Sequence, residues 1–167
     1  SAEPFSAGRI LPHEKTHAGP KEDRRRLMHA TGCNLSPVFV LAPDESGALE
    51  SLLEEVERTA SWAKCEAIGA TQEVWIVAGA AAERIASTAG QAPVYIADGH
   101  HRFETSVLFR DEAPGAWRPG AARTLAHVVS FQDPGLAILP THRIVLGEPL
   151  SREAFLSASM SRNSISA

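Results

Sequence analysis

Apolar residues along the chain recur at two different periods. Four aliphatic residues between positions 47 and 60 follow helical spacing: Leu49, Leu52, Leu53 and Val56. That spacing predicts an amphipathic helix whose charged residues face water. Short apolar runs at 36–41 and 94–97 are typical of strands instead. Because segments of these two kinds alternate throughout, we predict an α/β (α+β) protein in which helices flank a mixed sheet.

The same patterns predict the remaining elements. Further helices are expected at residues 23–30, 80–89, 100–110 and 151–158. Further strands are expected at residues 64–69, 73–78, 124–131 and 137–146. The strands at 64–69 and 73–78 are close enough to form a hairpin through residues 70–72, and residues 114–120 are expected to be a loop.

Residues 1–22 are expected to be irregular, with a candidate site loop inside them. Prolines and glycines interrupt this segment: Pro4, Gly8, Pro12, Gly19 and Pro20. We expect a single domain over residues 1–167. Since the chain opens without a methionine and ends on residues that suggest no element, we expect it to be part of a longer protein.

Composition narrows the class of protein. The chain is 44% hydrophobic and 22% charged, and it has no apolar run near the roughly 20 residues that a membrane span needs. A net charge of -4 argues against a nucleic-acid partner. Cys33 and Cys65 are too few and too far apart for a disulfide framework, so we expect two small buried thiols in a cytoplasmic protein.

The largest cluster of candidate site residues directly follows the apolar run at 94–97. Asp98, Gly99, His100, His101 and Arg102 come directly after it, where Gly99 allows a sharp reversal into a helix. The start of a helix presents unpaired N–H groups and the positive end of its dipole. With imidazoles and a guanidinium nearby, this corner is predicted to bind phosphate or carboxylate.

The individual residues of this corner allow more than one role. Asp98 can be a helix cap that accepts the His101 amide, and a capping aspartate can also hold a metal-bound water or accept a proton from a substrate hydroxyl. His100 and His101 diverge by about 100 degrees on a helix, so they are not expected to chelate one ion together. His101, Arg102 and Thr105 lie roughly on the face of Asp98.

The candidate site loop carries His13, Glu14, Lys15, Thr16 and His17, which match the His-Glu-x-x-His pattern of zinc peptidases. That pattern needs a long helix, whereas the prolines on either side leave room for barely two turns. Alternatively, Glu14 acts as an acid or base and Lys15 contacts phosphate, or the segment is a solvated loop. His142 and Arg143 form a second His-Arg pair that could add charge to the same pocket.

Several ordered blocks of the sequence resemble a prokaryotic family known as domain of unknown function 1015. They are residues 10–16, 20–24, 30–39, 95–105 and 139–143. The likeness covers nearly the whole chain. It implies no reaction, but members of that family are longer at both ends than this chain, which fits the expectation of a fragment.

The Asp-Gly-His-His-Arg block by itself resembles the signature of the ParB and sulfiredoxin-like superfamily, which includes an ADP-dependent kinase of free serine. The resemblance implies that Gly99, His100, His101 and Arg102 bind phosphates and that Asp98 assists a metal or the substrate. That kinase also uses an upstream glutamate as its base, for which Glu14 is the candidate here.

These observations together predict a nucleotide-binding or phosphate-binding protein, and a small-molecule kinase is the favoured activity. Its cofactors would be Mg²⁺ with ATP or ADP, and its partner a small phosphorylated ligand. One alternative is a nucleotide-binding or regulatory module without catalysis. Another is a metal-dependent hydrolase built on His13, Glu14 and His17. The oligomeric state stays open.

Overall fold

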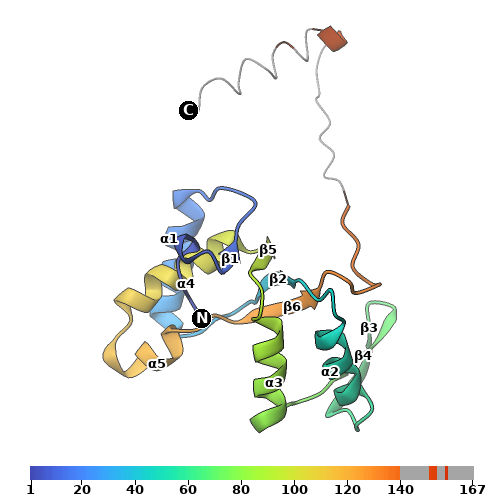
Figure 1. The fold of residues 1–167 in the computed structure, drawn as a ribbon. Helices are drawn as coiled ribbons and strands as arrows, with labels where there is room; N and C mark the ends of the chain where they lie inside the picture. Colours follow the sequence, from blue (N-terminus) through green and yellow to red (C-terminus); the bar gives the residue numbers. More distant parts are fainter. Residues whose placement is uncertain (140–150, 154–156, 158–167) are drawn as a thin grey trace. The chain divides into compact units, whose positions relative to one another are not determined.

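A four-stranded mixed sheet forms the centre of the fold (Figure 1). The structure, a computed structural model, describes residues 1–139, 151–153 and 157, and all elements below belong to its first compact unit, Ser1–Leu136. The strand order is β1 (Ile10–Leu11), β5 (Val94–Asp98), β2 (Val38–Ala42), β6 (Ala126–Ser130). The outer pairs β1–β5 and β2–β6 are parallel, and β5–β2 is antiparallel. The mixed α/β sheet predicted from sequence is therefore confirmed.

Helices and a separate hairpin surround this sheet. The helices are α1 (Ala18–Thr31), α2 (Ala48–Glu57), α3 (Gly79–Ala89), α4 (His100–Glu112) and the short α5 (Arg118–Ala121). The hairpin is formed by β3 (Ala63–Ala67) and β4 (Ala70–Val74). Helix α1 packs along α4, and α2 packs against α3. Helix α4 begins directly after β5, with only Gly99 between them.

The core forms where α4 crosses the sheet. Val38 and Val40 are two residues apart on β2 and so share one face, where they pack with Ile96 of β5 and Phe103 of α4. The Phe103 ring also stacks on Phe5, with 5.1 Å between ring centroids. This cluster holds the N-terminal segment, the sheet and the first turns of α4 together.

Several boundaries differ from the prediction for identifiable reasons. Helix α1 begins at Ala18 and not at residue 23, because a proline is tolerated in the first helical turn and Gly19-Pro20 therefore does not end the helix. The predicted loop 114–120 contains a 3₁₀ turn, Gly115–Trp117, and the start of α5. The hairpin is confirmed, but it turns at Ile68-Gly69, where both residues have positive φ.

Two further expectations concern the end of the chain and its thiols. Residues 137–139 have no regular structure, and 140–146 of the strand expected there lie outside the described residues. Of the last predicted helix, Arg152, Glu153 and Ser157 are helical. The cysteines were expected to be buried, but both are exposed. Cys65 is exposed because no layer among the described residues covers its hairpin. None of the described helices is long and apolar enough to cross a membrane.

Phe103 offers a test of how much the core stabilises the helix that carries the site. Phe103→Ala removes a ring that is 2% exposed, so we expect the free energy of unfolding to fall by about 3–5 kcal/mol. The matched control on the same helix is Leu108→Ala, which changes a side chain 45% exposed and should cost less than about 1 kcal/mol. Urea unfolding of both variants measures the difference, and equal losses would contradict a core centred on Phe103.

Candidate functional site

The corner between β5 and α4 is built around Gly99. Its φ of 94° lies in the left-handed region, which favours glycine, and a Cβ there would come within 2.9 Å of the Arg102 Nε atom, so a side chain would also displace the guanidinium. Helix α4 follows at once, and no side chain of the described residues accepts a hydrogen bond from its start. The N–H groups of the first turn, on His100, His101 and Arg102, are therefore without a side-chain acceptor in this part of the chain.

Asp98 does not cap the helix, contrary to one of its two expected roles. The residue at the cap position is Gly99, and the Asp98 carboxylate instead binds the guanidinium of Arg102 through Oδ2. An arginine one turn along the helix is a better partner than a backbone amide, because the ion pair adds charge attraction to the hydrogen bond. Oδ1 of Asp98 accepts no hydrogen bond from the described residues, and the side chain is 73% exposed.

Arg102 forms hydrogen bonds with residues outside its own helix. Its guanidinium donates to the Pro37 carbonyl and to Ser36 Oγ, the latter at 3.1 Å, as well as to Asp98. These bonds join α4 to the end of β5 and to the residues just before β2. These bonds use both N–H groups of Nη1 and one of Nη2, so the N–H of Nε and the second N–H of Nη2 have no acceptor among the described residues.

Residues 12–17, called the site loop below, lie against the first turn of α4. Two of their backbone amides donate to the adjacent imidazoles: His13 N to His100 Nε2 at 3.2 Å, and His17 N to His101 Nε2 at 3.0 Å. Because neighbouring side chains on a helix diverge, each imidazole meets a different part of the loop. The loop is thus attached to the helix at both of its ends.

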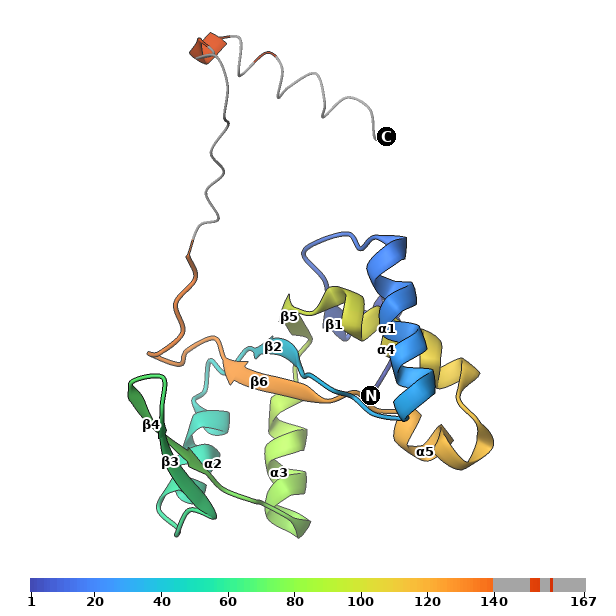
Figure 2. The same ribbon diagram turned by 180° about the vertical axis from the view of Figure 1, so that it is seen from behind.

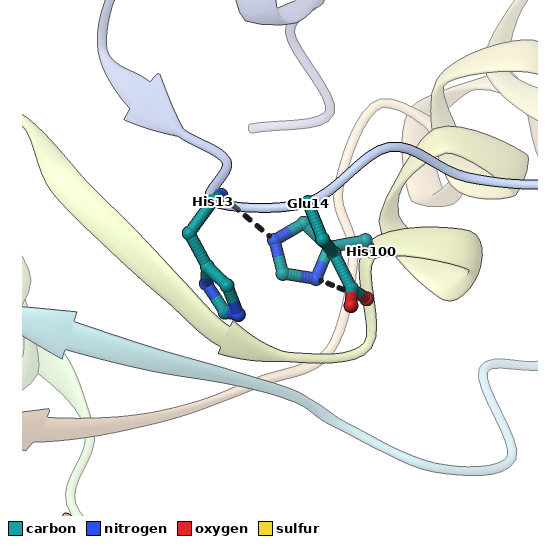
Figure 3. Close-up of side chains that lie close together, drawn as sticks. All are labelled: His13, Glu14 and His100. Carbon is teal, nitrogen blue, oxygen red and sulfur yellow. Dashed lines mark hydrogen bonds and ion pairs between the residues drawn. The ribbon is translucent and has the colours of Figure 1, made fainter. Parts of the chain in front are cut away.

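Hydrogen bonds show which ring nitrogen carries the proton in His13 and in His100. Figure 3 shows the two rings with Glu14. Since Nε2 of His100 accepts the His13 amide, the neutral His100 ring carries its proton on Nδ1. That atom lies 3.0 Å from Glu14 Oε1, outside the angular range of a hydrogen bond, and has no other polar partner in the described structure. Nδ1 of His13 lies 2.8 Å from the Ile96 carbonyl, which can only accept, so His13 keeps a lone pair on Nε2.

His100 and Glu14 differ in how much of each side chain is exposed to solvent. The His100 side chain has no exposed surface, whereas that of Glu14 is 52% exposed. Loss of hydration lowers the pKa of His100, and the nearby Glu14 carboxylate offsets this only in part. At neutral pH a neutral, buried imidazole therefore lies beside a carboxylate that is open to solvent.

A metal ion is a further possibility at this place. Candidate ligand atoms of His13, Glu14 and His100 all lie within 4.8 Å of one another. His13 fits a metal well, because a carbonyl holds its other ring nitrogen. His100 fits poorly, because its Nδ1 bears a proton as long as the His13 amide donates to Nε2.

The His-Glu-x-x-His pattern does not form the helix that zinc peptidases need. Residues 13–17 precede α1, and His17 is the residue before its first turn. His17 meets His101, with 6.2 Å between ring centroids, while His13 meets His100 at 4.5 Å. The expected grouping of His13, Glu14 and His17 is thus replaced by His13, Glu14 and His100.

The other sequence candidates lie in different settings. Lys15 is exposed on the site loop. Thr105 is fully buried, and its hydroxyl donates to the His101 carbonyl at 2.6 Å, which turns it away from the open side of the corner. His142 and Arg143 lie outside the described residues.

Sequence reasoning missed a polar group that anchors the site loop. Glu104 accepts hydrogen bonds from Thr16 at 2.7 Å and from Lys21 at 2.8 Å. Partial burial by itself would raise the pKa of Glu104, but these two bonds outweigh it and the pKa is lowered. Its position four residues after His100 was the available signal, since residues at that spacing share a helix face.

A family comparison covers nearly the whole of this structure. The family described as Protein of unknown function (DUF1015) matches residues 1–166. The chain belongs to this family. No curated protein and no solved structure matches it. The DUF1015 description names no reaction, so a function has to be argued from the residues at the corner between β5 and α4. The likeness to ParB and sulfiredoxin-like proteins stays a prediction.

The depressed pKa of His100 makes stability depend on pH. In the unfolded chain the ring takes up a proton near pH 6.5, and in the folded protein only at lower pH. The unfolded state therefore binds more protons as pH falls below about 6.5, and the folded state loses stability there. We expect His100→Gln, which cannot titrate, to flatten the fall in unfolding free energy between about pH 7.5 and 5.5.

Urea unfolding at several pH values measures this change. His127→Gln, which alters an exposed histidine on β6, is the control and should keep the wild-type pH dependence. An unchanged slope in His100→Gln would show that His100 does not carry the effect.

Proposed function

We propose that the corner binds the phosphate groups of a small molecule, with a nucleotide as the favoured ligand. The observation that supports this most is the uncapped first turn of α4 directly after Gly99. Its N–H groups and the helix dipole both favour an anion, and the Arg102 guanidinium lies beside Gly99 at the same place. Lys15, exposed on the adjoining site loop, adds a positive charge that can reach a phosphate oxygen.

We extend the proposal to phosphoryl transfer because of Glu14. A catalytic base must be both ionised and accessible, and this half-exposed carboxylate is open beside the helix start. In the proposed step Glu14 takes the proton of a substrate hydroxyl, the hydroxyl oxygen bonds to the terminal phosphorus, and the bond to the leaving phosphate breaks. The Nδ1 atom of His100 lies 3.0 Å from this carboxylate, and a neutral ring does not neutralise it.

Magnesium belongs to this proposal as the ion that neutralises phosphate charge. Asp98 is the residue that fits it, because Oδ1 is open to solvent while Oδ2 binds Arg102. A hard cation with one protein oxygen takes its remaining oxygens from phosphates and water.

Two alternatives rest on specific observations. The ties of Arg102 to Asp98 and Pro37 favour a binding module in which these residues are structural and nothing is turned over. The grouping of His13, Glu14 and His100 favours a zinc site, although the proton on His100 Nδ1 speaks against it. Zinc content after purification, compared between the wild type and His13→Ala, separates the zinc site from the other two.

A thermal-shift titration tests the binding proposal. We expect pyrophosphate, ADP or ATP to raise the melting temperature of the chain in a magnesium-dependent manner, because a ligand stabilises the state that binds it. Lys15→Ala should weaken that binding by about ten-fold, while Arg118→Ala, which removes an exposed charge on α5, should leave it unchanged. No shift with any of the phosphate compounds would refute the phosphate site.

The catalytic part is tested with Glu14→Gln. We expect it to keep the ligand-induced shift but to lower the release of nucleotide product with a hydroxylated acceptor by about 10²–10⁴-fold. Free serine is the first acceptor to try, because of the resemblance to the serine kinase. Glu83→Gln, an exposed glutamate on α3, is the control. Binding without turnover by the wild type would favour the module, and full turnover by Glu14→Gln would refute the base.

A further inference from the structure

The hairpin of β3 and β4 lacks the support that a small sheet needs. The two strands form a sheet of their own, and no other described strand pairs with them (Figure 2). Every residue of both strands is exposed except Ala67, which is partly buried. A two-stranded ribbon is marginally stable by itself in water. One edge of β3 is therefore open to another strand.

The hairpin turn determines which peptide groups point to that edge. Ile68 and Gly69 form a two-residue turn, flanked by the pair Ala67 and Ala70. The pair that closes such a turn is hydrogen-bonded, and every second pair after it is too. The peptide groups of Ala67, Cys65 and Ala63 therefore face β4. Those of Lys64 and Glu66 face the free edge.

We propose that β3 pairs antiparallel with β3 of a second copy of this chain, about a two-fold axis at Cys65. In this register Lys64 lies opposite Glu66 of the second copy, and Glu66 opposite its Lys64. Both residues direct their peptide groups to the shared edge, so the two copies form a ladder of backbone hydrogen bonds. The two hairpins become one four-stranded sheet.

The charges on the strand fit a second copy of itself. Lys64 already binds Glu73 on β4, and Glu66 accepts a bond from Thr71 at 2.6 Å. In the joined sheet each Lys64 lies between two carboxylates, its own Glu73 and Glu66 of the other copy. Opposite charges in facing pairs stabilise a sheet, whereas a lysine at an edge disfavours most other strands.

The facing segments in this register are the five residues of β3, Ala63 to Ala67. The ladder ends there, because Ile68 lies in the hairpin turn with a positive φ and Trp62 donates its N–H to the Val74 carbonyl of β4. The free edge of β4 offers no comparable fit, because its centre would put Thr71 opposite Glu73.

Charge exchange tests this interface. Sedimentation velocity of the 167-residue chain should show a monomer–dimer equilibrium. Lys64→Glu puts glutamate opposite glutamate, and Glu66→Lys puts lysine opposite lysine, so each should raise the dissociation constant at least about ten-fold. The double variant, or an equimolar mixture of the two single variants, restores opposite charges and should restore the dimer. Glu73→Gln removes the pair within the chain but leaves the edge intact, so it should still dimerise.

Cys65 provides a second and independent readout. The proposed axis places Cys65 directly opposite its equivalent in a pair that is not hydrogen-bonded, where Cα atoms lie about 4.5–5.5 Å apart, close enough for a disulfide. Diamide accepts two electrons and two protons from two thiols, so it should join the copies in the wild type and in Cys33→Ser but not in Cys65→Ser. A chain that stays monomeric, a dimer that ignores the charge variants, or linkage through Cys33 would each refute the interface.

Discussion

The candidate site depends on two backbone amides that donate to two neighbouring imidazoles. Each imidazole accepts from a different end of the site loop, and this is possible only because adjacent side chains at the start of a helix point in different directions. The loop has no secondary structure of its own, so these contacts and the bonds to Glu104 decide where Glu14 and His13 lie. Without these hydrogen bonds, a segment that lacks regular structure would sample many backbone conformations.

The division of work between the two histidines follows from burial. His100 lies under the loop, and burial keeps its ring neutral. It can therefore lie next to the Glu14 carboxylate without neutralising it. His101 is only partly buried and closes the far end of the loop. Arg102 then fixes the helix to the sheet through Asp98 and Pro37. Three consecutive residues, His100, His101 and Arg102, thus serve three distinct structural purposes before any ligand is considered.

Sequence alone predicted the features that arise from local chemistry. The turn at Gly99 and the helix after it could be predicted because a glycine directly after an apolar run permits the backbone reversal that the following helical spacing requires. The contact of Glu14 with His100 could not, since it joins residues far apart in sequence through β1, a strand of two residues whose pattern is too short to detect. The expected role of Asp98 as a cap was wrong because Arg102, one turn away, competes for the same carboxylate. The cysteines were misjudged because burial depends on neighbouring layers, which composition does not reveal.

The parallel pairing of β1 with β5 ends at a proline, and a side chain continues it. Ile10 pairs with Val94 and Leu11 with Tyr95, but Pro12 has no N–H to extend the ladder. The next carbonyl of β5, on Ile96, is instead taken by the ring of His13. The register of β1 on β5 therefore also decides which ring nitrogen of His13 carries the proton in this structure. A slip of β1 along β5 would separate His13 from the Ile96 carbonyl and move Glu14 away from His100 in the same step.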